Sequence, residues 1–256
     1  MQAQSRRHRQ EEIKMRLPKF LSSFAILLVL CQSTYASDIP YKEVKTFSLK
    51  NVFGTKSDWR VTAWQPVGNE SDMGEVSARL CFWMQPAEQR KYCTSITSSL
   101  PNDGIVYHYQ TAQGLEVVHP DAANPSAALL KFGARFFGGG SGSLDQVSFW
   151  YYDKKADAFE PSSHITLTEQ GEYRLFDKGK LEGKLVTADA VLQVGETHFS
   201  PHHFYIEAYR YDAGHYTKIL GYLTPTKYPS FEDTNTIDVI MPEIPRIEGL
   251  LTQFSQ

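Results

Sequence analysis

The segment VGETHFSPHHFY, residues 194–205, gathers the side chains best suited to metal or proton chemistry: Glu196, His198, His202 and His203. A carboxylate beside imidazoles could ligate zinc or move a proton to a substrate. In an extended strand, with a rise of ~3.3 Å per residue, His198 and His202 lie about 13 Å apart. That separation is too large for a single zinc ion, whose ligand bonds are about 2 Å long.

A helix would bring His198 and His202 together, but Pro201 between them removes a helical donor. A zinc site or an exported hydrolase built on Glu196, His198 and His202 therefore requires the chain to fold back at Pro201. Because no HExxH order is present, we predict a structural or partner-contacting loop and keep the metal and hydrolase interpretations as alternatives.

A second candidate is the run GGGSGS, residues 138–143. It is not a nucleophile elbow, because GxSxG needs glycine where Ser143 stands, and no Gly-Lys-Ser/Thr follows to make a phosphate loop. We predict a turned loop that contacts a partner and assign no catalytic residue. Its proposed contact residues are Gly138, Gly139, Gly140 and Ser141.

The elements that position these loops follow a signal for export. Basic residues precede the short apolar run FLSSFAILLVL, residues 20–30, which is typical of a secretory signal peptide. We predict cleavage near Ala36, with Met1 or Met15 as the start, and a periplasmic or secreted protein that has no membrane segment after cleavage. Lys plus Arg then falls from 26 to 20 and Asp plus Glu from 29 to 27, a net charge of −7 that argues against nucleic-acid binding.

The mature chain, residues 37–256, is predicted to be one all-β domain. Short runs alternate apolar and polar residues and are separated by Gly, Pro, Asp and Asn, a pattern typical of antiparallel sheets. We expect a small or incomplete β-propeller of about four antiparallel sheets, with a two-sheet sandwich as the alternative, and a short C-terminal helix near Pro245. Cys81 and Cys93 flank a turn-prone segment, which predicts a disulfide across a hairpin.

Weak internal repeats are predicted near residues 75–98, 127–160 and 185–220. Trp150 aligns with Tyr209, Tyr152 with Tyr211 and Asp153 with Asp212, each in a strand that leads to a Tyr-Asp turn. In this alignment the glycine-rich and histidine-rich segments occupy equivalent positions. We therefore expect both loops to emerge on the same side of the scaffold.

The run LLKFGARFFGGGSGSLDQVSFWYYDKKADAF, residues 129–159, resembles one unit of the divergent FG-GAP-like β-propeller proteins of the bacterial periplasm. Some members of that group inhibit lysozyme-like peptidoglycan hydrolases. The Asp-rich calcium loop of many such repeats is replaced here by HPDAANPSAA, residues 119–128, so the resemblance implies no calcium. Calcium and zinc remain alternatives to the cofactor-free protein that we predict.

The resulting functional hypothesis is an exported protein that docks onto a protein partner. The acidic charge suits a basic, lysozyme-like hydrolase, against which the protein would act as an inhibitor or immunity factor. The rival hypotheses are the exported hydrolase or metal-dependent enzyme described above, and an envelope carbohydrate-binding module that uses exposed Trp or Tyr.

Overall fold

The computed structural model describes residues 39–68, 75–85, 91–99, 104–121, 124, 127–138, 142–229 and 238–253. The predicted signal peptide, Gly139, Gly140 and Ser141 lie outside these residues. All structural statements below concern the described part of the chain.

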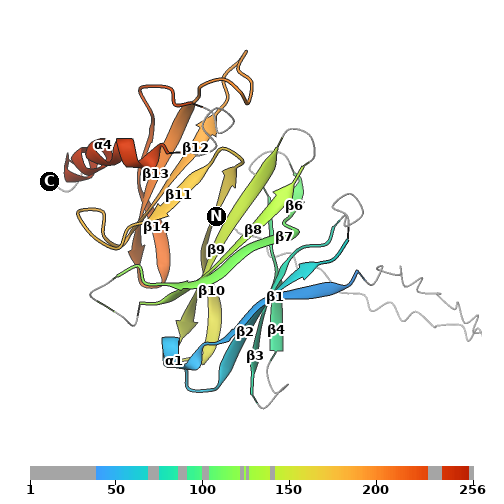
Figure 1. Ribbon diagram of the computed structural model, residues 1–256. Helices are drawn as coiled ribbons and strands as arrows, with labels where there is room; N and C mark the ends of the chain where they lie inside the picture. Colours follow the sequence, from blue (N-terminus) through green and yellow to red (C-terminus); the bar gives the residue numbers. More distant parts are fainter. Residues whose placement is uncertain are drawn as a thin grey trace, which may run out of the picture. The chain divides into compact units, whose positions relative to one another are not determined.

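Three four-stranded antiparallel sheets follow one another along the sequence (Figure 1). The first sheet contains β1 (Tyr41–Ser48), β2 (Trp59–Pro66), β3 (Arg79–Met84) and β4 (Lys91–Ser95). The second contains β7 (Thr111–Val118), β8 (Leu129–Phe137), β9 (Ser143–Asp153) and β10 (Ala158–Thr168). The third contains β11 (Glu172–Leu175), β12 (Lys184–Val191), β13 (His203–Asp212) and β14 (His215–Leu223).

The smaller elements are a two-stranded ribbon, β5 (Thr97–Ser99) with β6 (Val106–His108), and the helices α1 (Lys50–Phe53) and α4 (Ile240–Gln253). In every four-stranded sheet each strand pairs with the next one along the chain, so each sheet is a meander. The all-β class, the antiparallel sheets and the C-terminal helix are thus confirmed. The expected number of about four antiparallel sheets is also confirmed, with three sheets of four strands and one of two. The described residues do not show a closed propeller or barrel.

Apolar side chains on alternate strand positions join the first sheet to the second. Trp59 and Phe82 from the first sheet pack in one cluster with Phe132, Trp150 and Phe159 from the second. Phe82 and Phe159 stack with ring centroids 5.1 Å apart. Period-two alternation supplies this arrangement because successive side chains in a strand point to opposite faces.

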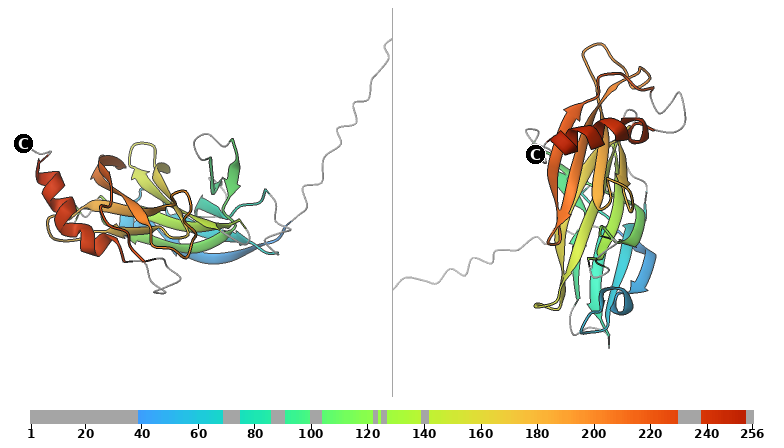
Figure 2. Two further views of the ribbon diagram at one scale, coloured as in Figure 1. Left: turned by 90° about the horizontal axis from the view of Figure 1, so that it is seen from above. Right: turned by 90° about the vertical axis from the view of Figure 1, so that its left-hand side faces the viewer.

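The opposite face of the second sheet packs on the third. Leu129, Val147 and Phe149 contact Leu185 and Tyr216 in a second buried cluster. The outer face of the third sheet is covered by α4, which lies across its strands (Figure 2). The sheets and α4 therefore form consecutive layers, and each of the second and third sheets is buried on both faces over much of its area.

Helix α4 begins five residues before Pro245, at Ile240. The Glu172 carboxylate accepts hydrogen bonds from the backbone N–H groups of Val239 and Ile240, at 2.9 and 3.1 Å. These groups lack intrahelical partners at a helix start, and a negative charge there is favourable. Glu172, on β11, thus fixes where α4 begins.

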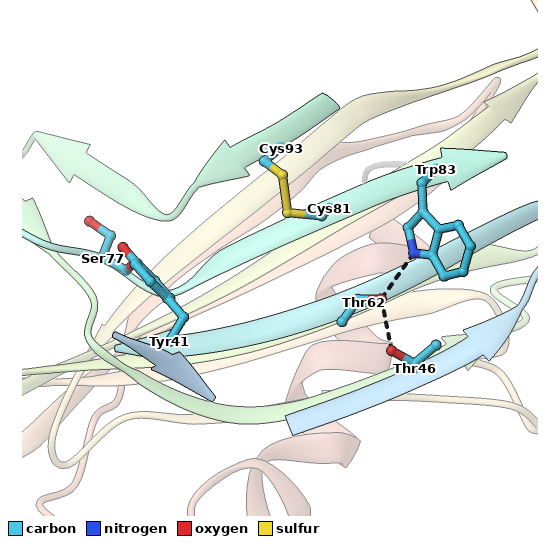
Figure 3. Close-up of a disulfide and its surroundings, with 7 residues drawn as sticks. All are labelled: Tyr41, Thr46, Thr62, Ser77, Cys81, Trp83 and Cys93. Atoms are coloured by element: carbon cyan, nitrogen blue, oxygen red, sulfur yellow. Dashed lines mark hydrogen bonds between the residues drawn. A yellow bond between two sulfur atoms is a disulfide. The ribbon is translucent and has the colours of Figure 1, made fainter. Parts of the chain in front are cut away.

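The predicted disulfide is confirmed between Cys81 on β3 and Cys93 on β4 (Figure 3). The two residues are direct cross-strand partners with Cα atoms 4.0 Å apart. On the same face of the sheet, Trp83 Nε1 donates to Thr62 Oγ1 at 3.0 Å, and the Thr62 hydroxyl pairs with that of Thr46 at 2.7 Å. The disulfide and this hydrogen-bond chain together link β1, β2, β3 and β4.

Each of the three predicted repeats contains the third strand of one sheet and at least the beginning of the fourth. These hairpins are β3–β4, β9–β10 and β13–β14. Tyr152 pairs with Phe159 beside the β9–β10 turn, and Tyr211 pairs with Tyr216 beside the β13–β14 turn. The aligned aromatic residues therefore occupy equivalent cross-strand positions in two sheets.

Candidate functional site

The segment that we call the histidine loop, residues 192–202, connects β12 to β13 at the end of the third sheet. Two consecutive turns shape it. The Glu196 N–H donates to the Gln193 carbonyl at 3.0 Å, and the Ser200 N–H donates to the Thr197 carbonyl at 3.0 Å. Gly195 adopts φ +88°, a conformation that strongly favours glycine. The backbone of the loop is thus held by its own hydrogen bonds.

Glu196 anchors the loop to its surroundings. One carboxylate oxygen lies 2.5 Å from Lys227 Nζ, and the other accepts from the Gln193 N–H at 2.9 Å and contacts His202 Nδ1 at 3.1 Å. The Lys227 ammonium, the Gln193 N–H and the His202 imidazole lower the pKa of Glu196 to about 2. Glu196 therefore stays ionised and bound over the whole physiological pH range.

His202 is completely buried at the base of the loop. Its backbone pairs with Tyr228 through two hydrogen bonds of 2.9 and 2.8 Å. Its Nε2 atom has no hydrogen-bond partner among the described residues. A ring in this position orients the loop but presents no nitrogen to a substrate.

The other two histidines do not converge on Glu196. The His198 carbonyl accepts a hydrogen bond from Gln170 Nε2 at 2.7 Å, which ties the loop to the segment after β10. His203 Nδ1 donates to the Thr224 carbonyl at 2.8 Å within the third sheet. Of the predicted metal candidates, only Glu196 and His202 meet, and the described residues contain no group of three or more potential metal ligands.

The apolar residues of the histidine loop point outward. Val194 is fully exposed, Phe199 is 65% exposed and Leu192 is 46% exposed. Such residues on a loop whose backbone is fixed are typical of a contact surface, because binding would cost little further conformational entropy.

The GGGSGS segment, residues 138–143, which we call the glycine loop, falls in the corresponding connection of the second sheet, between β8 and β9. The Gly138 N–H donates to the Gly142 carbonyl at 2.9 Å. A Cβ atom at residue 138 would lie 3.0 Å from that carbonyl, a tight contact, so the close approach of the backbone favours glycine. Both loops connect the second strand of a sheet to the third, and Figure 1 shows these strand ends at the upper end of their sheets.

A polar crevice that the sequence interpretation missed begins where the histidine loop leaves β12. It has a volume of about 440 Å³ and is lined by β10, β12 and β13, with Asp189 and Glu207 in its wall. The available signal was the alternation in KLVTADAV and HFYIEAYRY, whose polar residues fall on one face of two adjacent strands.

No helix among the described residues is long and apolar enough to cross a membrane. Comparison of the chain with protein-family models, with curated proteins and with solved structures gave no match.

Proposed function

We propose that this protein is an exported binding protein whose histidine loop docks onto a protein partner. The observation that carries the proposal is the loop itself, in which Leu192, Val194 and Phe199 are exposed while Glu196 and His202 fix the backbone from below. Apolar anchors on a rigid β scaffold are a common basis of protein recognition.

The partner that fits best is a basic cell-wall-active enzyme, with this protein acting as its inhibitor or immunity factor. Support comes from the acidic charge of −7 that remains once the proposed leader is removed from the 26 basic and 29 acidic residues. Opposite charges speed association and disfavour wrong partners. The predicted export places both proteins outside the cytoplasm.

The loop geometry favours docking over hydrolysis. Both carboxylate oxygens of Glu196 are engaged, and the buried His202 ring cannot reach a substrate. A carbohydrate platform of tryptophans is also less favoured, because Trp59 and Trp150 are core residues with exposures of 0% and 3%. The other two tryptophans, Trp64 and Trp83, are only partly exposed. The three meanders stacked in chain order support, as part of the same proposal, an open and incomplete propeller of which each meander is one blade.

Affinity capture tests the proposal. The exported chain is immobilised and exposed to a panel of purified lysozyme-like hydrolases, with the double variant Val194→Asp/Phe199→Ser beside it. We expect stoichiometric capture of at least one hydrolase, weakened tenfold or more by the double variant.

The control is Val52→Ser, which changes another surface valine, 40% exposed, on α1. It should capture as the parent does. Capture that is equally strong with and without the loop residues would contradict docking through the histidine loop.

A further inference from the structure

The crevice beside the histidine loop lies between the facing surfaces of the second and third sheets. Its wall on β12 and β13 carries Thr187, Asp189, Tyr205 and Glu207, and His164 lines it from β10. Ala190 and Val191 also line it, so the crevice reaches the residue that precedes the loop. A ligand group in the crevice would therefore belong to the same partner surface as a group resting on the loop.

The two carboxylates in this wall differ in their partners. Glu207 lies 2.5 Å from Lys218 Nζ and accepts from the Tyr209 hydroxyl at 2.5 Å, so its charge is matched. Asp189 Oδ1 accepts only neutral donors, the Thr168 N–H at 2.9 Å and the Thr168 hydroxyl at 2.6 Å. No Lys, Arg or His among the described residues forms an ion pair with Asp189. The crevice thus contains one negative charge without a matching cation.

The surroundings of Asp189 disfavour its ionised form. Burial raises the pKa of Asp189, and the nearby charge of Glu207 acts in the same direction despite the hydrogen bonds from Thr168. An ionised carboxylate can only accept hydrogen bonds, so its complement must bring N–H or O–H donors. A group that also brings positive charge would offset both the burial and the repulsion.

The aromatic ring beside Asp189 favours a cation over a neutral polyol. Tyr205 is the direct cross-strand partner of Asp189 and is 38% exposed. Lys218 already lies over this ring, with Nζ 5.3 Å from its centroid, which shows that the ring face accepts an ammonium group. A guanidinium entering the crevice could hydrogen-bond to the carboxylate while its flat side stacks on the face of the Tyr205 ring that Lys218 does not occupy, because the ring edge carries partial positive charge.

We propose that the crevice binds the side chain of an arginine or lysine presented by the protein partner that the histidine loop contacts. That the arginine or lysine belongs to a protein partner rests on the proposed function. That the crevice binds a cation does not. The crevice volume of about 440 Å³ accommodates either side chain. The planar guanidinium favours arginine, because it can offer two N–H groups to a carboxylate and a flat face to the Tyr205 ring.

The test uses small probes that carry only the head group. n-Butylguanidinium and n-butylammonium are titrated into the exported chain, followed by amide chemical shifts of β12 and β13, with n-butanol as the neutral probe. Asp189→Asn removes the charge while its side-chain oxygen can still accept from Thr168. Glu160→Gln, an exposed acid elsewhere on β10, controls for unspecific attraction.

We expect saturable binding of n-butylguanidinium, weakened at least tenfold in Asp189→Asn and unchanged in Glu160→Gln, and no binding of n-butanol. Tyr205→Leu should weaken it severalfold and serves as the second variant if Asp189→Asn does not fold. Equal binding by parent and Asp189→Asn, or equal losses in both acidic variants, would overturn the cation site. So would binding of an N-acetylglucosamine oligomer by a protein that does not bind the cations.

The loop variant Val194→Asp/Phe199→Ser separates the two proposals. If it loses capture of hydrolases and retains n-butylguanidinium binding, both proposals hold. If no hydrolase is captured by the parent protein and the probe still binds, the crevice site stands and the proposed partner is wrong.

Discussion

The second and third sheets have the same strand order, yet equivalent positions are used differently. Aligning Trp150 with Tyr209 places the cross-strand pair Ala134–Gln146 on Asp189–Tyr205. In the second sheet Ala134 lies in the core against the first sheet, with no exposure. In the third sheet Asp189 lines the polar crevice.

The next pair along shows the same change. Phe132–Ser148 in the second sheet corresponds to Thr187–Glu207 in the third. The boundary between the first and second sheets is thus filled by the ring of Phe132. At the boundary between the second and third sheets, Thr187 and Glu207 line an open crevice instead. The strand order of a meander therefore does not determine whether one face of the sheet packs as core or lines a crevice. A few side chains near one end of two adjacent strands determine it.

The strongest test of this comparison introduces an aspartate into the second sheet at position 134, which is equivalent to Asp189. Ala134→Asp places a carboxylate at a fully buried position of the second sheet, within the core that faces the first sheet, and should lower the free energy of unfolding by about 3–5 kcal/mol. Urea denaturation at pH 7 measures the loss. The neutral variant Ala134→Asn separates charge from volume, and a loss of the same size in both would contradict the electrostatic account.

The first sheet differs from the other two in having a covalent link between its third and fourth strands. Cys81→Ser/Cys93→Ser should lower the free energy of unfolding by about 2–3 kcal/mol, because the open chain gains conformational freedom when unfolded. Denaturation of the variant is compared with that of the parent after full reduction. The two curves should coincide, and an unchanged midpoint in the variant would show that the hydrogen bonds of β3 and β4 suffice.

The converse variant, Asp189→Asn, removes the acid from the third sheet and should stabilise the protein. A carboxyl group whose pKa is raised on folding favours the folded state below its unfolded pKa, and this contribution is lost as pH rises through the folded pKa. At pH 7 the variant should therefore have a higher melting temperature than the parent. The gain should disappear in acid, and a lower melting temperature at pH 7 would assign Asp189 a structural role.

The two connecting loops should differ in their response to acid. Glu196 has a folded pKa of about 2 against an ordinary value of 4.5, so its stabilising contribution is complete above pH 4.5 and is lost as pH falls toward 2. Carboxyl NMR of the parent should find this low midpoint, and Lys227→Met should shift it upward. The described flanks of the glycine loop, Gly138 and Gly142, carry no titratable side chain, so their amide signals should not follow this transition.

Sequence reasoning predicted the elements with strong local signals. Period-two alternation identified the strands, and the spacing of Cys81 and Cys93 identified the disulfide. Apolar residues at helical spacing around Pro245, beginning with Ile244 and Ile247, identified α4. The expected count of about four antiparallel sheets was right, but the fourth sheet is only a two-stranded ribbon, because β5 and β6 have three residues each. Short edge segments have the same composition as strands of a full sheet.

The candidate site was predicted only in part. Glu196 and His202 were singled out, but their contact depends on two turns that bring residues six apart in sequence together, and Lys227 comes from beyond β14. Asp189 was missed because a single acid in an alternating strand looks the same whether it faces solvent or another sheet. Whether Asp189 faces solvent or another sheet depends on the strand packed opposite it, β10, which the local sequence pattern does not identify.

The contact between Glu172 and the start of α4 has a consequence for the order of folding. Each meander forms from neighbouring strands, whereas this contact joins residues 67 and 68 positions apart. During synthesis, the first two sheets have all their strands long before α4 exists, and the apolar outer face of the third sheet stays uncovered until residues 240–253 emerge. Helix α4 is therefore the last of the described elements to join, and a chain cut before residue 238 should aggregate through that face.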